Sequence, residues 1–158
     1  MDPSARSRKP GSPAGRRDAE HALRERIKEL KCLYGIAALA GRHAASLDAL
    51  LQGAVELLPP SWQYPEVACA RIRFEGKAYK TEGFVETADV QSAEILLQGE
   101  KVGSVEVFYT REMPPADEGP FLEEERALID AVAVKLAGAV RRTRIEHALR
   151  ERVKELDC

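Results

Sequence analysis

The sequence predicts an α+β fold, in which helices cover one face of an antiparallel sheet of about four strands. Four strand-like stretches follow one another at 67–74, 77–84, 91–98 and 101–109, and the first, third and fourth alternate between apolar and polar residues. Segments with apolar residues at helical spacing precede and follow them. Strands that follow one another without an intervening helix favour an antiparallel sheet with helices gathered on one side.

The composition is that of a chain with one compact domain. The chain has 158 residues, of which 44% are apolar, and a net charge of −2. The first 17 residues are rich in Pro, Gly and Ser and carry a charge of +4, so residues 18–158 carry −6. We expect residues 1–17 to form a disordered basic tail. An acidic folded part argues against nucleic acid as a partner.

The sequence contains no evident membrane segment or signal peptide. Its longest apolar run, 34–41, is far shorter than the roughly 20 residues that a membrane span requires. The three cysteines, Cys32, Cys69 and Cys158, do not suggest a disulfide framework without a secretory context. We therefore expect a cytoplasmic protein with no membrane partner.

A segment near the N-terminus is repeated near the C-terminus. Residues 19–32 read AEHALRERIKELKC and residues 145–158 read IEHALRERVKELDC, so 11 of 14 positions are identical at an offset of 126 residues. The apolar residues recur at spacings of four and three, which is the seam of a two-stranded coiled coil. We expect helices at 18–43 and 141–158 that pair with those of a second copy in a homodimer. The seam residues are Leu23, Ile27, Leu30, Tyr34, Leu149, Val153 and Leu156. The alternative is a solvated helix with intrahelical ion pairs, such as that of Glu25 with Lys28.

The predicted domain lies between these helices, at 44–140. Ser46 suits the N-cap of a short helix that Pro59 and Pro60 would end. Glu75-Gly76 and Gly99-Glu100 suit tight turns, so the strands should pair as two hairpins. Pro120 is expected at the first position of the last helix, which runs on into the second copy of the repeat.

Several blocks of the sequence resemble a known family. ERIKELKCLYGIAAL, LLQGAVELLPPSWQYPEVACARIRF, AEILLQGEKVGSVEVFY and DEGPFLEEERALIDAVAVKLA together resemble a compact GAF-like input domain of bacterial sensor histidine kinases and related signalling proteins. The resemblance covers roughly residues 25–144. It implies a GAF-like sheet and a sensory role in two-component signal transduction, with a histidine kinase or another output domain as a partner. The terminal helices would then relay a conformational change.

A small anionic ligand is a further expectation. Guanidinium groups on the polar sheet face could hold a carboxylate or phosphate beside aromatic residues. The candidate residues are Trp62, Tyr64, Arg71, Arg73 and Lys80. Two alternatives remain open: the arginines pair with Glu94 and Glu106 in a solvated cross-strand ladder, and the aromatic residues plug one end of the core.

We expect no enzymatic activity, no metal and no cofactor. The three Cys and three His show no CxxC or HExxH spacing, and His21 and His147 suit exposed coiled-coil positions. The alternative from another class is a GAF-fold thiol enzyme similar to free methionine sulfoxide reductase, with Cys69 as nucleophile and Arg71 beside it. A strand cysteine without a nearby resolving cysteine is usually inert, so we expect no thiol catalysis.

Overall fold

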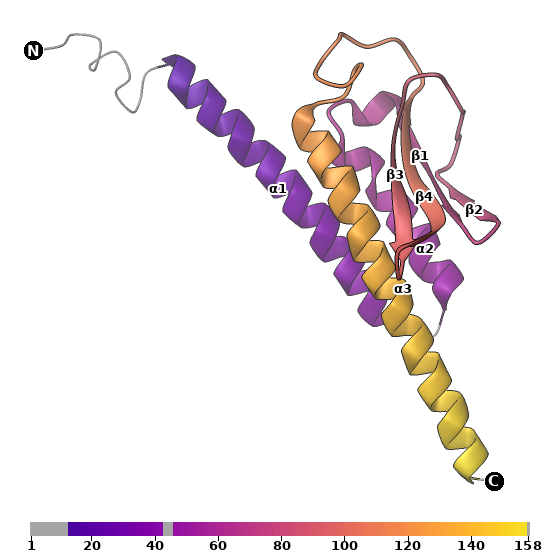
Figure 1. Ribbon diagram of the computed structural model, residues 1–158. Coiled ribbons are helices and arrows are strands. Elements are labelled where there is room, and N and C mark those ends of the chain that lie inside the picture. Colours follow the sequence, from indigo (N-terminus) through magenta and orange to yellow (C-terminus); the bar gives the residue numbers. More distant parts are fainter. Residues whose placement is uncertain (1–12, 43–45, 158) are drawn as a thin grey trace, which may run out of the picture.

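The computed structural model of the chain describes residues 13–42 and 46–157 and has the predicted α+β architecture (Figure 1). Its helices are α1 (Pro13–Arg42), α2 (Leu47–Leu57) and α3 (Glu123–Asp157), with short 3-10 helices η2 (Pro59–Ser61) and η3 (Pro65–Val67). Its strands are β1 (Ala68–Phe74), β2 (Lys77–Lys80), β3 (Val90–Leu97) and β4 (Glu100–Tyr109).

The start of α1 differs from the prediction. Residues 1–12 of the predicted tail lie outside the described residues, but residues 13–17 are helical because α1 begins at Pro13. Proline is favoured at the first position of a helix, where its missing N–H leaves no hydrogen bond unmade. The tail prediction is therefore wrong for residues 13–17.

The four strands form one antiparallel sheet in the order β2-β1-β4-β3. The two predicted hairpins, β1–β2 and β3–β4, are confirmed, but the second turn lies at Gln98-Gly99, one residue before the predicted Gly99-Glu100. Each is closed by a two-residue turn with positive φ at both positions, 47° and 85° at Glu75 and Gly76 and 51° and 82° at Gln98 and Gly99. Such turns match the twist of the strands that they join.

The second predicted strand is shorter than expected, because β2 ends at Lys80 instead of continuing to Phe84. The backbone N–H of Phe84 donates to the carbonyl oxygen of Thr81, and Gly83 has a φ of 72°. The backbone at Gly83 is therefore not extended and the strand cannot continue. Glycine permits this turn, since it adopts a positive φ without strain. Residues 81–89, which we call the strap, join β2 to β3 without regular secondary structure.

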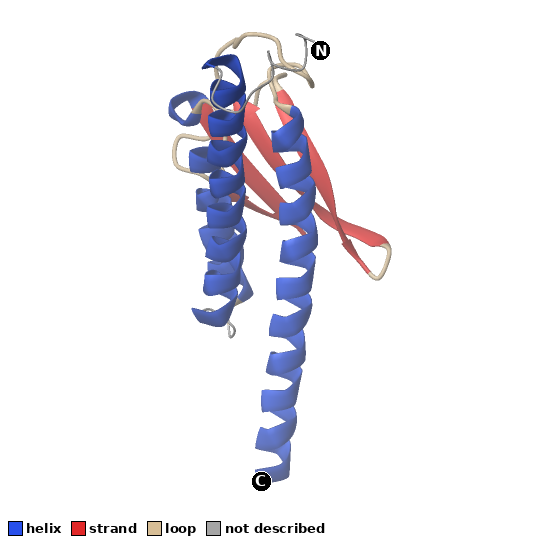
Figure 2. Ribbon diagram, turned by 90° about the vertical axis from the view of Figure 1, so that its left-hand side faces the viewer, coloured by secondary structure: helices blue, strands red, loops and turns tan. Residues whose placement is uncertain are grey.

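The core lies between the sheet and the helices. α2 and α3 pack on one face of the sheet, and α1 packs on α2 and α3 (Figure 2). Ala70, Ile72, Val105 and Val107 point into this core and are fully buried, as their alternation predicts. The predicted short helix is also confirmed, since the Ser46 hydroxyl accepts a hydrogen bond from the N–H of Ala49 at 3.2 Å.

α1 and α3 run side by side in the same direction, so the chain enters at one end of the domain and leaves at the other (Figure 1). α3 has 35 residues without a break, a length of about 52 Å. Its C-terminal part, which contains the second copy of the repeat, extends beyond the sheet (Figure 2). Within the described ranges, none of the helices is both long and apolar enough to cross a membrane.

The first turn of α3 is fixed by a buried carboxylate. Glu125 is 1% exposed and accepts hydrogen bonds from the N–H groups of Leu122 at 2.8 Å and Gln63 at 2.7 Å. Burial raises the pKa of Glu125, although these two donors oppose the shift. The helix therefore begins at Glu123, three residues later than the start predicted at Pro120.

Candidate functional site

α1 has two faces with different surroundings. Cys32, Ile36 and Ala40, four residues apart, pack on the rest of the domain and are at most 7% exposed. On another face, the predicted seam residues Leu23, Ile27 and Tyr34 are 60%, 43% and 69% exposed. Apolar side chains at this spacing on a surface are typical of a helix that pairs with another helix.

The seam residues of the second copy are exposed as well. Leu149, Val153 and Leu156 are 61%, 54% and 77% exposed on the part of α3 beyond the sheet. Two further aliphatic residues on α3, Val134 and Ile145, are 74% and 49% exposed. Val134, Ile145, Leu149 and Leu156 are separated by 11, 4 and 7 residues, which places them on one side of the helix.

Apolar residues of the two helices meet in a groove, in which Tyr34 and Val134 are exposed and Leu30 and Leu33 are half-buried. Leu30, Leu33 and Tyr34 of α1 line it together with Val134 of α3, and the groove has a volume of about 510 Å³. The seam of α1 is therefore continuous with the exposed side of α3. We call this surface the apolar stripe; it consists of Leu23, Ile27, Leu30, Tyr34, Val134, Ile145, Leu149, Val153 and Leu156.

Sequence reasoning missed Val134 and Ile145. Val134 lies in a part of α3 that also supplies core residues such as Val132 and Leu136, and Ile145 lies where the first copy of the repeat has Ala19. Their spacing to Leu149 is the signal that could have found them, since it equals whole turns of helix.

The structure separates the five predicted ligand residues into two groups. Trp62 and Tyr64 lie on the helix-covered side of the sheet, where Trp62 is fully buried and donates from Nε1 to Oε1 of Gln91 at 3.1 Å. Arg71, Arg73 and Lys80 lie together on the opposite face, which we call the outer sheet face. The aromatic residues therefore belong to the core, as the plug alternative holds.

Arg71 is bonded within the protein instead of facing an open pocket. Its Nε and Nη2 donate to Glu106 at 2.7 and 3.1 Å, and Nη1 donates to Glu86 of the strap at 2.9 Å. The guanidinium also lies 5.2 Å from the ring centre of Phe84 and 5.4 Å from that of Phe108. The hydrogen-bonded carboxylate of Glu106 raises the pKa of Arg71 further above its usual value.

The predicted ladder of ion pairs is present in part. Arg71 pairs with Glu106 directly across β1 and β4, as predicted, but Arg71 is only 7% exposed and hence not solvated. Glu94 pairs with Lys101 at 3.6 Å instead of with an arginine. Glu86, which sequence reasoning missed, reaches the arginines because the strap folds back over the sheet.

The strap also covers Cys69. The Cys69 thiol is 4% exposed and donates to the carbonyl oxygen of Val85 at 3.3 Å. Cys32 is buried on the helix side of the sheet, so no described thiol lies beside Cys69 as a resolving partner. The part of the chain that the structure describes also contains no group of three metal-ligating side chains.

No protein-family model, curated protein or solved structure shows a significant match to the chain. Function is therefore inferred from the apolar stripe, the outer sheet face and the course of α3.

Proposed function

We propose that the chain is a non-catalytic, GAF-like regulatory module that forms a homodimer through its apolar stripe and relays conformational change along α3. The exposed stripe is the observation that carries the proposal. Its nine residues follow both helices and continue along α3 beyond the sheet. Burial of an aliphatic side chain contributes about 1.5–3 kcal/mol. A partner that covers the stripe would therefore bind with a favourable contribution from several such side chains.

A second copy of the chain is the partner that fits this surface. The heptad spacing of Leu23, Ile27, Leu30 and Tyr34 suits knobs-into-holes packing against an identical helix. α1 and α3 run in the same direction (Figure 1), so a parallel dimer would bring four parallel helices together. We call the part of α3 beyond the sheet, residues 145–157, the α3 extension. In the dimer the extensions of the two protomers would lie side by side, so that Leu149, Val153 and Leu156 can pair with those of the partner.

α3 is suited to relay because it contacts the sheet and also extends past it. Arg126 donates to the carbonyl oxygen of Ser92 in β3 at 2.9 Å and pairs with Glu118 at 2.8 Å. Farther along the helix, Arg144 pairs with Glu75 of the β1–β2 turn. A shift of the sheet would therefore displace α3 at two points, and a rigid helix would carry the displacement to an output domain such as a histidine kinase.

A small anionic ligand on the outer sheet face remains a second proposal. Arg73 is about half exposed, but the two carboxylates that it pairs with, those of Glu86 and Glu106, also bind Arg71. An anion would have to displace Glu86 from both arginines. The strap would then move, and this movement would be the signal.

Sedimentation equilibrium of the full chain tests the dimer. The parent should sediment as a dimer, and a Leu23→Glu/Ile27→Glu variant should sediment as a monomer because charge on the stripe opposes association. Val85→Glu is the matched control, since Val85 is an exposed aliphatic residue away from the stripe; this variant should remain dimeric. A monomeric parent at micromolar concentration would overturn the proposal.

A further inference from the structure

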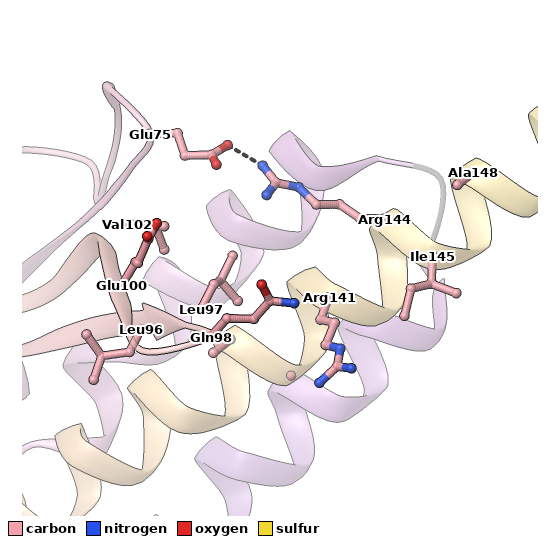
Figure 3. A pocket seen from close by; sticks show the side chains of 12 residues that line it. Glu75, Leu96, Leu97, Gln98, Glu100, Val102, Arg141, Arg144, Ile145 and Ala148 are labelled. Atoms are coloured by element: carbon pink, nitrogen blue, oxygen red, sulfur yellow. Dashed lines mark hydrogen bonds and ion pairs between the residues drawn. The ribbon is translucent and has the colours of Figure 1, made fainter.

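A groove separates the ends of the two hairpins from the part of α3 that leaves the domain (Figure 3). Glu75 of the β1–β2 turn and Leu96, Leu97 and Gln98 of β3 and its turn lie on one side. The α3 residues on the other side are Ala137, Gly138, Arg141, Arg144, Ile145 and Ala148. The groove has a volume of about 710 Å³, within the range of small-molecule sites.

The walls of this groove are mainly aliphatic. Leu96 and Ile145, which are 48% and 49% exposed, face it together with the half-buried Leu97 and Val102. Gly138 keeps the groove open on the helix side, since a Cβ built there meets no atom within 4 Å. A hydrocarbon chain could cover these side chains and remove apolar surface from water.

Two arginines project from α3 at the same groove (Figure 3). Arg144 pairs with Glu75, and its guanidinium lies 5.2 Å from the ring centre of Phe74. Arg141 has no hydrogen bond or ion pair with any residue in the described part of the chain. A guanidinium at the edge of an aliphatic groove binds a carboxylate through charge-assisted hydrogen bonds.

We propose that this groove binds a soluble aliphatic carboxylate, whose chain covers Leu96 and Ile145 and whose head group binds Arg141. The charge of the head group complements the unpaired guanidinium, and the chain complements the aliphatic walls. The same carboxylate competes with Glu75 for Arg144. Binding would therefore replace a contact between the sheet and α3 with a contact between the ligand and α3.

The groove shares Ile145 with the apolar stripe, so the ligand and the dimer partner would both contact this side chain. The effect of the ligand on signalling rests on the proposed relay function. Arg144 makes the contact with Glu75 at the last turns of α3 beside the sheet (Figure 3). A ligand that binds Arg144 in place of Glu75 would break this ion pair. The start of the α3 extension would then lose its contact with the β1–β2 turn. The groove is thus an input site next to the helix that would carry the output.

Calorimetric titration of the full chain with octanoate tests the site. We expect saturable binding of one octanoate per chain, and 1-octanol and acetate should each bind at least about tenfold more weakly because each lacks one half of the interaction. Arg141→Gln should weaken octanoate binding about tenfold or more. Glu75→Gln should tighten it, because the competing carboxylate is removed.

Two further variants separate the site from general effects of charge and stability. Gly138→Leu should abolish binding by filling the groove, and it should not lower the melting temperature because leucine favours a helix more than glycine does. Arg142→Gln removes the same charge from the neighbouring residue, which does not line the groove, and should bind octanoate as the parent does. Equal binding by Gly138→Leu and the parent would overturn the proposal, as would octanol binding as tightly as octanoate. Sedimentation of the same samples reports on the dimer separately.

Discussion

Among single residues, Arg71 holds the outer sheet face together, because it joins three parts of the chain. Its guanidinium bonds Glu106 of β4 and Glu86 of the strap, and it lies beside the rings of Phe84 and Phe108. The side chain starts on β1, so these contacts tie β1, β4 and the strap. A nearly buried ion pair of this kind is costly to break from one side, since the remaining carboxylate loses its partner.

Replacement of Arg71 by Gln should therefore lower the free energy of unfolding by about 2–3 kcal/mol. Arg73→Gln is the matched control, because Arg73 is a neighbouring arginine with an exposed head group and contacts of 3.3 and 3.8 Å to the same carboxylates. Its loss should cost about 1 kcal/mol or less. Urea unfolding of both variants measures the difference. Equal effects of the two substitutions would show that Arg71 acts only as a solvated charge.

The sequence could predict part of this arrangement. Alternation along β1 and β4 predicts that Arg71 and Glu106 share a face, and the structure places them directly opposite each other. The contacts with Glu86 and Phe84 could not be predicted in the same way, because a loop has no periodicity that fixes where its side chains lie. Trp62 and Tyr64 were grouped with the arginines for their chemistry, whereas the two 3-10 helices place them on the core side of the sheet.

At the scale of elements, the strap is the segment that the sequence describes least well. The sequence predicts a second strand that reaches Phe84, but β2 ends at Lys80 and the turn at Gly83 follows it. The strap is held by a few contacts: the edge-to-face packing of Phe84 on Phe108, the bond of Glu86 with Arg71, and the hydrogen bond of Thr87 with the Tyr109 carbonyl at 2.8 Å. A segment with few apolar contacts opens locally at lower cost than the whole domain unfolds.

Phe84→Ala should open the strap and expose Cys69 while the core stays folded. In a Cys158→Ser background, the rate of Cys69 modification by a thiol reagent should rise at least about tenfold, because local opening exposes the thiol. The rate of Cys32 modification should stay nearly unchanged, because Cys32 is buried on the opposite side of the sheet. Mass spectrometry of the labelled peptides separates the two sites.

The control for this experiment is Val85→Ala, which shortens an exposed strap side chain that makes none of the ring contacts. It should leave both labelling rates close to those of the parent. Parallel acceleration of Cys32 and Cys69 in Phe84→Ala would contradict the prediction, since it would indicate that the domain unfolds as a whole.

At the scale of the whole molecule, the two copies of the repeat have unlike surroundings. Part of the first copy packs on the domain, where Glu25 is half-buried and Cys32 is 2% exposed. The second copy extends past the sheet, and its described side chains are exposed, apart from the half-buried Glu146. Leu23 of the first copy and Leu149 of the second occupy the same position and are both exposed, and Leu30 is half-buried where its counterpart Leu156 is exposed. The stripe is thus the feature that the two copies share, which is why we assign it to a partner and not to the domain core.

The proposed dimer would stabilise the helical structure of the α3 extension. In a monomer, the side chains of residues 147–156 are exposed, and a helix end without tertiary contacts frays because propagation contributes little stability. In the proposed dimer, Leu149, Val153 and Leu156 are covered by the partner. Amide hydrogen exchange at residues 146–156 should therefore be slow in the parent and fast in the Leu23→Glu/Ile27→Glu variant, although both substitutions lie in α1. Amides at 128–140, which face the core, should stay protected in both proteins. Equal exchange of the extension in parent and variant would mean that the two helices do not belong to one interface.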